Sequence, residues 1–214
     1  MDQTLSKHTR DGKPVDIYHV SSPMALAFDG ESIWVTNGAD NTVTKLALDG
    51  SNLGTFVAGD FPIALAFDGE AIWAANHDLI NGRGKNALTK LSREGVHLGT
   101  FPLQLDLRTL VFDGEDLWIA HDTDHMVTKM STDGVSLGIF STGKGPEALL
   151  FDGESLWVVN NDINTIEHTV SRLNLNGETL DTYAVGTGPV ALGYDGEAVW
   201  VGNFFDSTVT RVKP

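Results

Sequence analysis

One ten-residue motif occurs five times in the chain, and this repetition constrains the fold more than any other feature of the sequence. Successive tryptophans of the motif are 39, 45, 39 and 43 residues apart. Short β-rich runs lie around each copy, split by Asp-Gly or Glu-Gly turns, which is typical of antiparallel strands joined by tight hairpins. A period near 40 residues with four short strands is typical of one β-propeller blade. The copies are FDGESIWVTN (28–37), FDGEAIWAAN (67–76), FDGEDLWIAH (112–121), FDGESLWVVN (151–160) and YDGEAVWVGN (194–203).

The pattern predicts an all-β protein, a single five-bladed β-propeller domain over residues 1–214, in which each blade is an antiparallel sheet of strands a to d. Strand a alternates small residues with leucine, as in Ala25-Leu26-Ala27, which suits the crowded strand nearest a central axis. Strand b is apolar at successive positions, as in Ile33-Trp34-Val35, because neighbouring blades cover both of its faces. The predicted blades span about 21–60, 61–106, 107–145, 146–188 and 189–214, the last completed by residues 1–20.

The two ends of the chain supply the expected closure. Residues 3–20 read as a c strand, an Asp-Gly turn and a d strand, whereas the last repeat stops after its own c strand, STVTRVKP. We therefore expect an N-terminal outer strand to complete the fifth blade, which would remove a free sheet edge. Residues 3–9 are then a surplus c-like strand, competing with residues 207–213 for one position.

Composition excludes several functions. The chain carries 29 acidic and 14 basic residues, a net charge of −15, without a basic cluster, which disfavours nucleic-acid or anionic-membrane partners. Ten of the 29 acidic residues are the Asp and Glu of the five motif copies, so much of the charge reflects turn chemistry. The absence of cysteine excludes disulfides, thiolate metal sites and cysteine nucleophiles. No apolar run is long enough to span a membrane, and we expect no signal peptide in the chain as given, hence a cytoplasmic protein or an exported domain whose signal has been removed.

The repeats resemble those of the YVTN-type and streptogramin-lyase-like β-propellers, within the wider NHL-like group. The resemblance covers about residues 3–213 and rests on the recurring pattern P-x-A-L-x-F-D-G-E-x-[IL]-W-V-x-N…N-T-V-T-K-L. It implies a repeat scaffold that serves cell-surface proteins, binding modules and a few enzymes. The lyase of this superfamily holds a magnesium ion with histidine and glutamate, in blades that read P-H-x-I and W-F-T-E. Here no His follows the strand-a proline, and the third residue after tryptophan is Asn or His.

Departures from the repeat are the best places to look for a site, because residues shared by all blades mostly build the blade. In a propeller the d–a and b–c loops lie together on one face. On that face the third and fourth blades carry Arg108, His121 and Glu147, where other blades have apolar residues or Asn. Imidazole and carboxylate groups can bind a divalent ion or transfer a proton near neutral pH. The candidate metal ligands, for Mg²⁺ or Ca²⁺, are His121, Asp122, His125 and Glu147, and His121 and Glu147 are also the acid–base candidates. A solvated loop with an Arg108–Glu147 ion pair is the structural alternative.

Other repeat positions have both a structural and a functional interpretation. Asparagines end strand b in four blades and are expected to cap turns or to line the channel mouth. Phe205, next to Phe204, is expected to cover a neighbouring loop or a ligand. The longer b–c loops, residues 76–86 and 160–168, extend beyond the scaffold, and the segment Gly82-Arg83-Gly84-Lys85 could contact an anion. The tryptophans are expected in the core between blades. The asparagines are Asn37, Asn76, Asn160 and Asn203.

These observations leave three functional interpretations open. The first is a non-catalytic scaffold that binds a small ligand or a protein through the d–a/b–c loop face, with Arg108, His121, Glu147, Phe205 and the four asparagines as contacts. The second is a metal-assisted lyase or hydrolase related to streptogramin lyases, in which Arg108 holds an anionic group. The third is a designed or fragmentary propeller without an evolved site.

Overall fold

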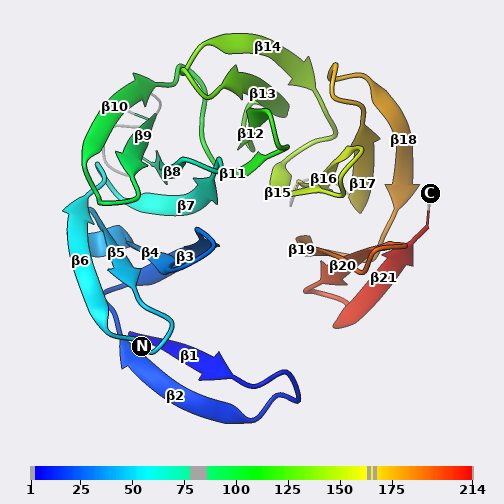
Figure 1. The fold of residues 1–214 in the computed structure, drawn as a ribbon. Helices are drawn as coiled ribbons and strands as arrows, with labels where there is room; N and C mark the ends of the chain where they lie inside the picture. Colours follow the sequence, from blue (N-terminus) through cyan, green and yellow to red (C-terminus); the bar gives the residue numbers. More distant parts are fainter. Residues whose placement is uncertain (1–2, 78–85, 163–164, 166–167, 214) are drawn as a thin grey trace. The chain divides into compact units, whose positions relative to one another are not determined.

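The computed structural model describes residues 3–77, 86–162, 165 and 168–213, and the chain divides into two compact units, Met1–Gln104 and Leu105–Pro214 (Figure 1). The first unit holds β1 (Thr4–His8), β2 (Pro14–His19), β3 (Pro23–Phe28), β4 (Ile33–Asn37), the 3-10 turn η1 (Gly38–Asp40), β5 (Thr42–Leu46), β6 (Asn52–Val57), β7 (Pro62–Phe67), β8 (Ala71–Asn76), β9 (Ala87–Ser92) and β10 (His97–Pro102). The second unit holds β11 (Thr109–Phe112), β12 (Asp116–His121), β13 (Met126–Ser131), β14 (Ser136–Ser141), β15 (Pro146–Phe151), β16 (Leu156–Asn161), β17 (His168–Leu173), β18 (Thr179–Ala184), β19 (Pro189–Tyr194), β20 (Val199–Asn203) and β21 (Thr208–Val212).

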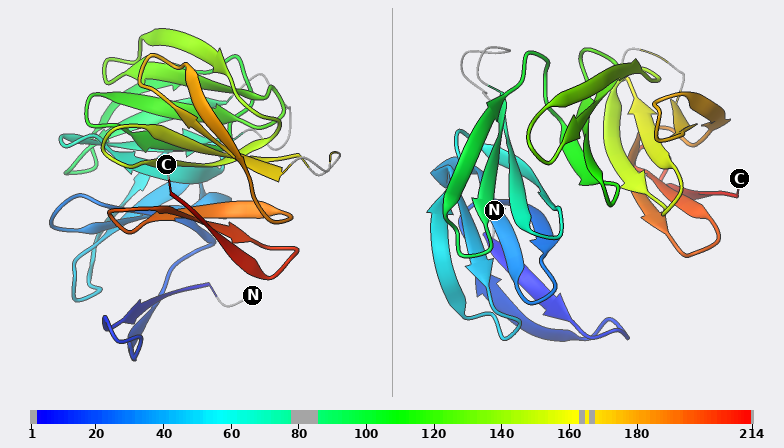
Figure 2. Two further views of the ribbon diagram at one scale, coloured as in Figure 1. Left: turned by 90° about the vertical axis from the view of Figure 1, so that its right-hand side faces the viewer. Right: turned by 45° about the horizontal axis from the view of Figure 1, so that its top comes forward.

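Strands that follow one another in sequence pair antiparallel in every sheet, as the hairpin turns predict. The first unit has two four-stranded sheets, β3-β4-β5-β6 and β10-β9-β8-β7, and the two-stranded sheet β1-β2. The second unit has the four-stranded sheets β11-β12-β13-β14 and β15-β16-β17-β18, and the three-stranded sheet β19-β20-β21. Each sheet is twisted, as Figure 2 shows. The predicted all-β architecture of four-stranded antiparallel sheets is confirmed for four repeats. Within the described part of the chain, no helix is long and apolar enough to cross a membrane.

The N-terminal residues form a sheet of their own, in which β2 pairs with β1. The sheet β19-β20-β21 has three strands among the described residues of the second unit. The described residues form six sheets, so five complete blades are not confirmed, and closure of the last blade by residues 1–20, which would join the two units, stays a prediction. Within the first unit, β1 also contacts the sheet β3–β6. Leu5 packs beside the buried Val35 and Leu46, and Lys7 Nζ donates a hydrogen bond to the carbonyl oxygen of Leu48 at 2.8 Å.

The Asp-Gly turn of each motif is tied to its tryptophan by side-chain hydrogen bonds. In the first copy, Asp29 Oδ1 accepts the backbone N–H groups of Glu31 and Ser32 at 2.9 and 2.6 Å, and Asp29 Oδ2 accepts the Trp34 indole N–H at 2.8 Å. The glycine that follows has φ near +92°, a conformation that glycine adopts without strain. The other four copies form the same indole bond at 2.7 to 2.8 Å. The repeated aspartates are therefore structural, which explains much of the acidic composition.

Three of the five tryptophans, Trp34, Trp118 and Trp157, pack in the core between adjacent sheets, as predicted, and Trp73 is also completely buried. In the first unit Trp34 packs with Leu65, Ile72 and Leu91 of the next sheet. The second unit repeats this arrangement, with Trp118 and Trp157 each packed against the sheet that follows. Each buried tryptophan also contacts an aromatic residue of its own outer strand, with ring centroids 5.1 to 5.8 Å apart.

Trp200 is the exception to this packing. It is 39% exposed, whereas the other four tryptophans are completely buried. Among the described residues its sheet has three strands, so the outer strand that carries the aromatic partner of the other tryptophans has no counterpart there. The described part of the second unit also holds no sheet after β19-β20-β21 against which Trp200 could pack.

Candidate functional site

Two charged side chains from neighbouring sheets of the second unit meet where the sequence places a candidate site. Arg108 immediately precedes β11, and Glu147 lies at the start of β15. Arg108 Nε donates to Glu147 Oε2 at 3.0 Å, and Arg108 Nη2 pairs with Glu147 Oε1. This hydrogen bonding to Glu147 raises the pKa of Arg108. The Arg108 side chain is 46% exposed and that of Glu147 is 18% exposed, so a ligand could reach the pair from solvent.

His121 lies at the end of β12 and is almost completely buried. Its Nδ1 is hydrogen-bonded to the Asp106 carbonyl oxygen, which can only accept, so Nδ1 carries the proton. Its Nε2 therefore accepts the hydroxyl of Thr128, at 2.7 Å. Burial lowers the pKa of His121, so the ring is neutral at physiological pH.

Both candidate histidines occupy positions where another blade has asparagine. Asn37 Nδ2 donates to Thr44 Oγ1 at 2.8 Å, in the register where His121 bonds Thr128. Asn41 Oδ1 accepts the backbone N–H that precedes the strand-a proline of the next sheet, and His125 Nδ1 accepts the equivalent N–H of Gly145 at 3.1 Å. Asn41 and His125 also share a left-handed backbone, with φ of 59° and 60°. The imidazoles of His121 and His125 thus form hydrogen bonds that asparagine side chains form in the first blade.

Asp122 is the most electrostatically perturbed group of the site. Burial contributes most to its raised pKa, followed by a hydrogen bond to the carboxyl group of Asp106 and repulsion from its charge. The positive charge of Arg108 opposes these effects, and the resulting pKa is about 6. Asp122 Oδ1 is buried and has no hydrogen-bond partner within the described part of the chain. The loop also contains Asp124, whose carboxylate accepts the Asp106 backbone N–H at 2.9 Å.

The four asparagines at the ends of the b strands are all buried, and each donates to a hydroxyl of its neighbouring c strand. They stabilise the sheet ends, although through side-chain hydroxyls rather than the backbone groups that turn caps use. Asn160 Oδ1 also accepts the hydroxyl of Thr142 at 2.7 Å. In the described residues, Oδ1 of Asn37, Asn76 and Asn203 is buried without a hydrogen-bond partner.

Phe204 and Phe205 lie in the exposed loop between β20 and β21. Their rings meet edge to face, with centroids 5.5 Å apart. Phe205 also lies directly over Gly188, at the loop that leads into β19. The expectation that one aromatic residue covers a neighbouring loop is therefore confirmed, and both rings keep exposed surface.

The remaining candidates do not gather into one centre. Among residues 3–77, 86–162, 165 and 168–213, no three His, Asp or Glu side chains come together as metal ligands. Either nitrogen of His121 would have to give up a hydrogen bond to coordinate an ion. The segment Gly82–Lys85 lies outside the described residues, as do residues 78–81 of the same loop and residues 163–164 and 166–167 of the other long b–c loop.

The site thus differs in part from the predicted set. Arg108, Glu147 and Asp122 come together, while His121 and His125 form hydrogen bonds that hold the adjoining loops. Asp106 was missed, and after burial its hydrogen bond and its charge contribute most to the raised pKa of Asp122. Its position two residues before Arg108, in the same d–a loop, was the available signal.

No protein-family model and no curated protein matches the sequence. Similar solved structures include virginiamycin B lyase from Staphylococcus aureus (TM-score 0.78, 16% identity, 100% of this chain and 78% of that one) and a streptogramin B lyase (0.70, 20%, 90% and 66%). Hydrazine synthase from Kuenenia stuttgartiensis is similar as well (0.72, 16%, 92% of this chain), and our chain spans only 58% of that protein. At these identities the likeness establishes the fold alone. The chain has a streptogramin-lyase-like β-propeller fold, as its repeats suggest.

Proposed function

We propose that this chain is a non-catalytic propeller scaffold that binds a small ligand or a protein segment, bearing a positively charged group, at the loops around Arg108 and Glu147. The proposal depends on one observation. Arg108 and Glu147, which depart from the repeat pattern in two neighbouring sheets, form an ion pair that solvent can reach. The carboxyl groups of Glu147, Asp122 and Asp106 act on the Arg108 guanidinium. A fourth carboxyl group, that of Asp124, binds the Asp106 backbone N–H.

The charge balance sets the class of ligand. Above pH 6 Asp122 is mostly ionised, so the carboxylates outnumber Arg108 and attract a cation. An amine can accept Glu147 as a partner in place of, or beside, Arg108. A metal-assisted lyase is less well supported, because His121 and His125 are already committed to hydrogen bonds that hold the loops.

We also propose that the five Asp–Trp turns correspond to five blades, the last of which is the incomplete sheet β19-β20-β21. The support is that Asp195 bonds the Trp200 indole as in the four complete sheets. Its turn also places Gly196 at a φ of 94°, close to the values of the equivalent glycines.

A thermal-shift screen with small diamines and their dicarboxylate counterparts, at pH 7.5, tests the binding proposal. We expect amines to raise the melting temperature and dicarboxylates to have no effect. Glu147→Gln should weaken the best amine about tenfold or more, which is the loss of one charge-assisted contact. Glu154→Gln, in the hairpin turn of the same sheet, is the matched control and should bind normally. Equal binding by the two variants, or a preference for dicarboxylates, would reject the proposal.

A further inference from the structure

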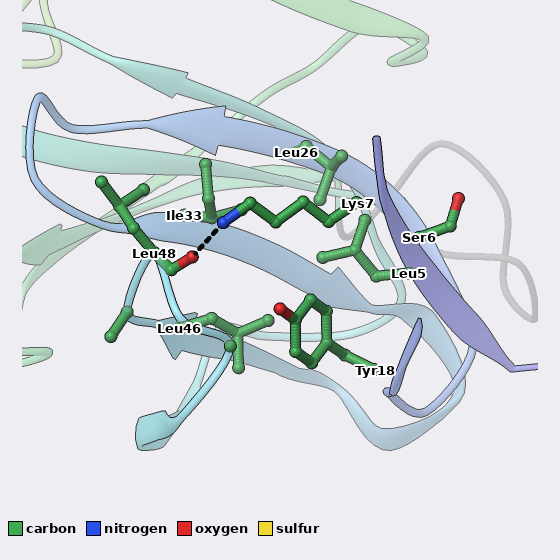
Figure 3. Close-up of a pocket in the computed structure, with 10 residues that line it drawn as sticks. Leu5, Ser6, Lys7, Tyr18, Leu26, Ile33, Leu46 and Leu48 are labelled. Carbon is green, nitrogen blue, oxygen red and sulfur yellow. Dashed lines mark hydrogen bonds between the residues drawn. The ribbon is translucent and has the colours of Figure 1, made fainter. Parts of the chain in front are cut away.

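An apolar cavity of about 250 Å³ lies within the first unit, between the β1–β2 hairpin and the sheet β3–β6 (Figure 3). The Lys7 side chain extends across it to the Leu48 carbonyl oxygen, shown as a dashed line in Figure 3. Ser6 also lines the cavity, and its larger walls are aliphatic or aromatic side chains. They are Leu5, Tyr18, Leu26, Ile33 and Leu46.

The hairpin contacts this sheet as the outer two strands of a blade contact the next blade. Lys7 donates to the Leu48 carbonyl oxygen at 2.8 Å, and Lys45 of β5 donates to the Arg93 carbonyl oxygen at 2.7 Å. Leu48 and Arg93 occupy the same place in the turns between third and fourth strands. Lys129 of the second unit forms the same bond to the following sheet at 3.1 Å. Thus β1 occupies the position of a third strand.

The outer strand of the hairpin, β2, contacts the next sheet in the same way as β6 does. The Tyr18 ring covers Gly50, just as the Phe56 ring of β6 covers Gly95 in the next turn. Both glycines have a positive φ and leave room for the ring. The hairpin is therefore the outer half of a blade, and the described residues of the first unit include no strands that would form its inner half.

The inner half of a blade supplies a tryptophan, and the cavity lies where that indole would be. In the next interface of the same unit, Trp34 packs with Leu65, Ile72 and Leu91. The equivalent residues of the sheet β3–β6 are three of the cavity walls. They are Leu26, Ile33 and Leu46.

The exposure of Leu26 and the strand pairing of β1 show that the cavity lacks a covering strand and its tryptophan. Leu26 is 52% exposed, whereas its equivalent Leu65 is 9% exposed. The edge of β1 away from β2 is where a second strand pairs in the complete sheets. In that pairing Trp34 stands opposite Lys45, whose Nζ lies 5.2 Å from the indole centroid. A tryptophan on a strand paired with β1, opposite Lys7, would form the same cation–π contact with the Lys7 ammonium group.

We propose that this cavity binds the indole of a tryptophan-bearing β-hairpin from another polypeptide, with the pattern D-G-E-x-[IL]-W. The hairpin supplies a strand to the open edge of β1 and an aromatic ring to the cavity. A complete blade does not fit, because β1 already holds the third-strand position. This argues against a second copy of the chain, since β20, which carries the exposed Trp200, is already paired with a third strand, β21.

Calorimetry on the 214-residue chain, with a synthetic peptide of residues 62–76 as the probe, tests the proposal. The peptide contains one inner-strand hairpin, including Trp73. We expect one peptide to bind per chain and to protect the amides of β1 from hydrogen exchange. The Trp73→Ala peptide should bind at least about tenfold more weakly, because it loses a large buried ring. Leu26→Gln in the protein should weaken binding similarly, whereas Leu98→Gln, equally exposed on β10, should not.

Four results would overturn the proposal. The first is no binding, and the second is equal binding of the two peptides or by the two protein variants. The third is binding of N-acetyl-tryptophanamide as tightly as the peptide, which would show that strand pairing contributes nothing. The fourth is self-association in sedimentation that Trp200→Ala abolishes, which would make a second copy the occupant.

Discussion

Replacing Asp113 with Asn tests the contribution of the Asp–Trp turn, together with the ion pair that Asp113 Oδ2 forms with Lys129 Nζ at 3.9 Å. Asp113 Oδ1 accepts the backbone N–H groups of Glu115 and Asp116 at 2.9 and 2.7 Å, and Oδ2 accepts the Trp118 indole N–H at 2.8 Å. In Asp113→Asn the amide oxygen can keep the two backbone bonds. The amide nitrogen then faces the indole N–H, so two donors meet in a site that water does not reach, because Trp118 is completely buried.

The expected loss of stability follows from that geometry. A hydrogen bond to a charged acceptor contributes about 1.5–3 kcal/mol, and a buried donor left without a partner costs about 1–3 kcal/mol. Both values describe the loss of the one hydrogen bond between Asp113 and Trp118, so they are not added. We expect Asp113→Asn to lower the free energy of unfolding by about 2–3 kcal/mol.

Asp195→Asn is the matched control, because Asp195 makes the same three bonds at 2.8, 2.8 and 2.7 Å. Trp200 is 39% exposed, so water can accept its indole proton, and the loss should be clearly smaller. Urea unfolding followed by far-ultraviolet circular dichroism measures both variants, with an unchanged m-value as the condition for comparison. Equal losses would show that burial of the indole is irrelevant, and a neutral Asp113→Asn would refute the structural role of the turn.

Three further outcomes are expected. Folding raises the pKa of Asp122 from 3.8 to about 6, so the folded state binds this proton more tightly than the unfolded state does. The free energy of unfolding should therefore fall as the pH rises from about 4 to about 6. In melting temperatures measured across this pH range, Asp122→Asn should reduce the fall. Gly177→Ala should destabilise more than Gly153→Ala in urea unfolding, because both have positive φ but only at Gly177 would a Cβ meet an aromatic ring; equal losses would contradict this. Iodide should quench mainly Trp200, so Trp200→Phe should remove most of the quenchable fluorescence and Trp157→Phe should not.

Much of the fold was predictable because its determinants are local. The Asp-Gly turn and the tryptophan five residues after the aspartate lie within one hairpin, so the sequence contains both partners of each bond. The place of β1 was not predictable in this way. It depends on Lys7 reaching a backbone carbonyl 41 residues away, and a backbone acceptor leaves no mark on the sequence.

The candidate site was predictable only in part, for the same reason. Arg108 and Glu147 stood out as departures from the repeat, and they do form a pair. The coupling of Asp106 to Asp122 arises from two loops that converge in space, which spacing does not indicate. His121 and His125 were interpreted as ligands from their chemistry, although alignment with the asparagines of the first blade could have suggested their hydrogen-bonding role.

The division of contacts within and between sheets has a consequence for how such a chain can change in evolution. Each aspartate bonds the tryptophan of its own blade, and the lysines of β5 and β13 bond the next sheet through main-chain carbonyl oxygens. A duplicated blade therefore carries both partners of its Asp–Trp bond, and its lysine needs only a main-chain carbonyl oxygen of the next sheet. At these contacts gene duplication can lengthen or shorten the array without matched substitutions, whereas a side-chain pair between sheets, such as Arg108–Glu147, requires both residues.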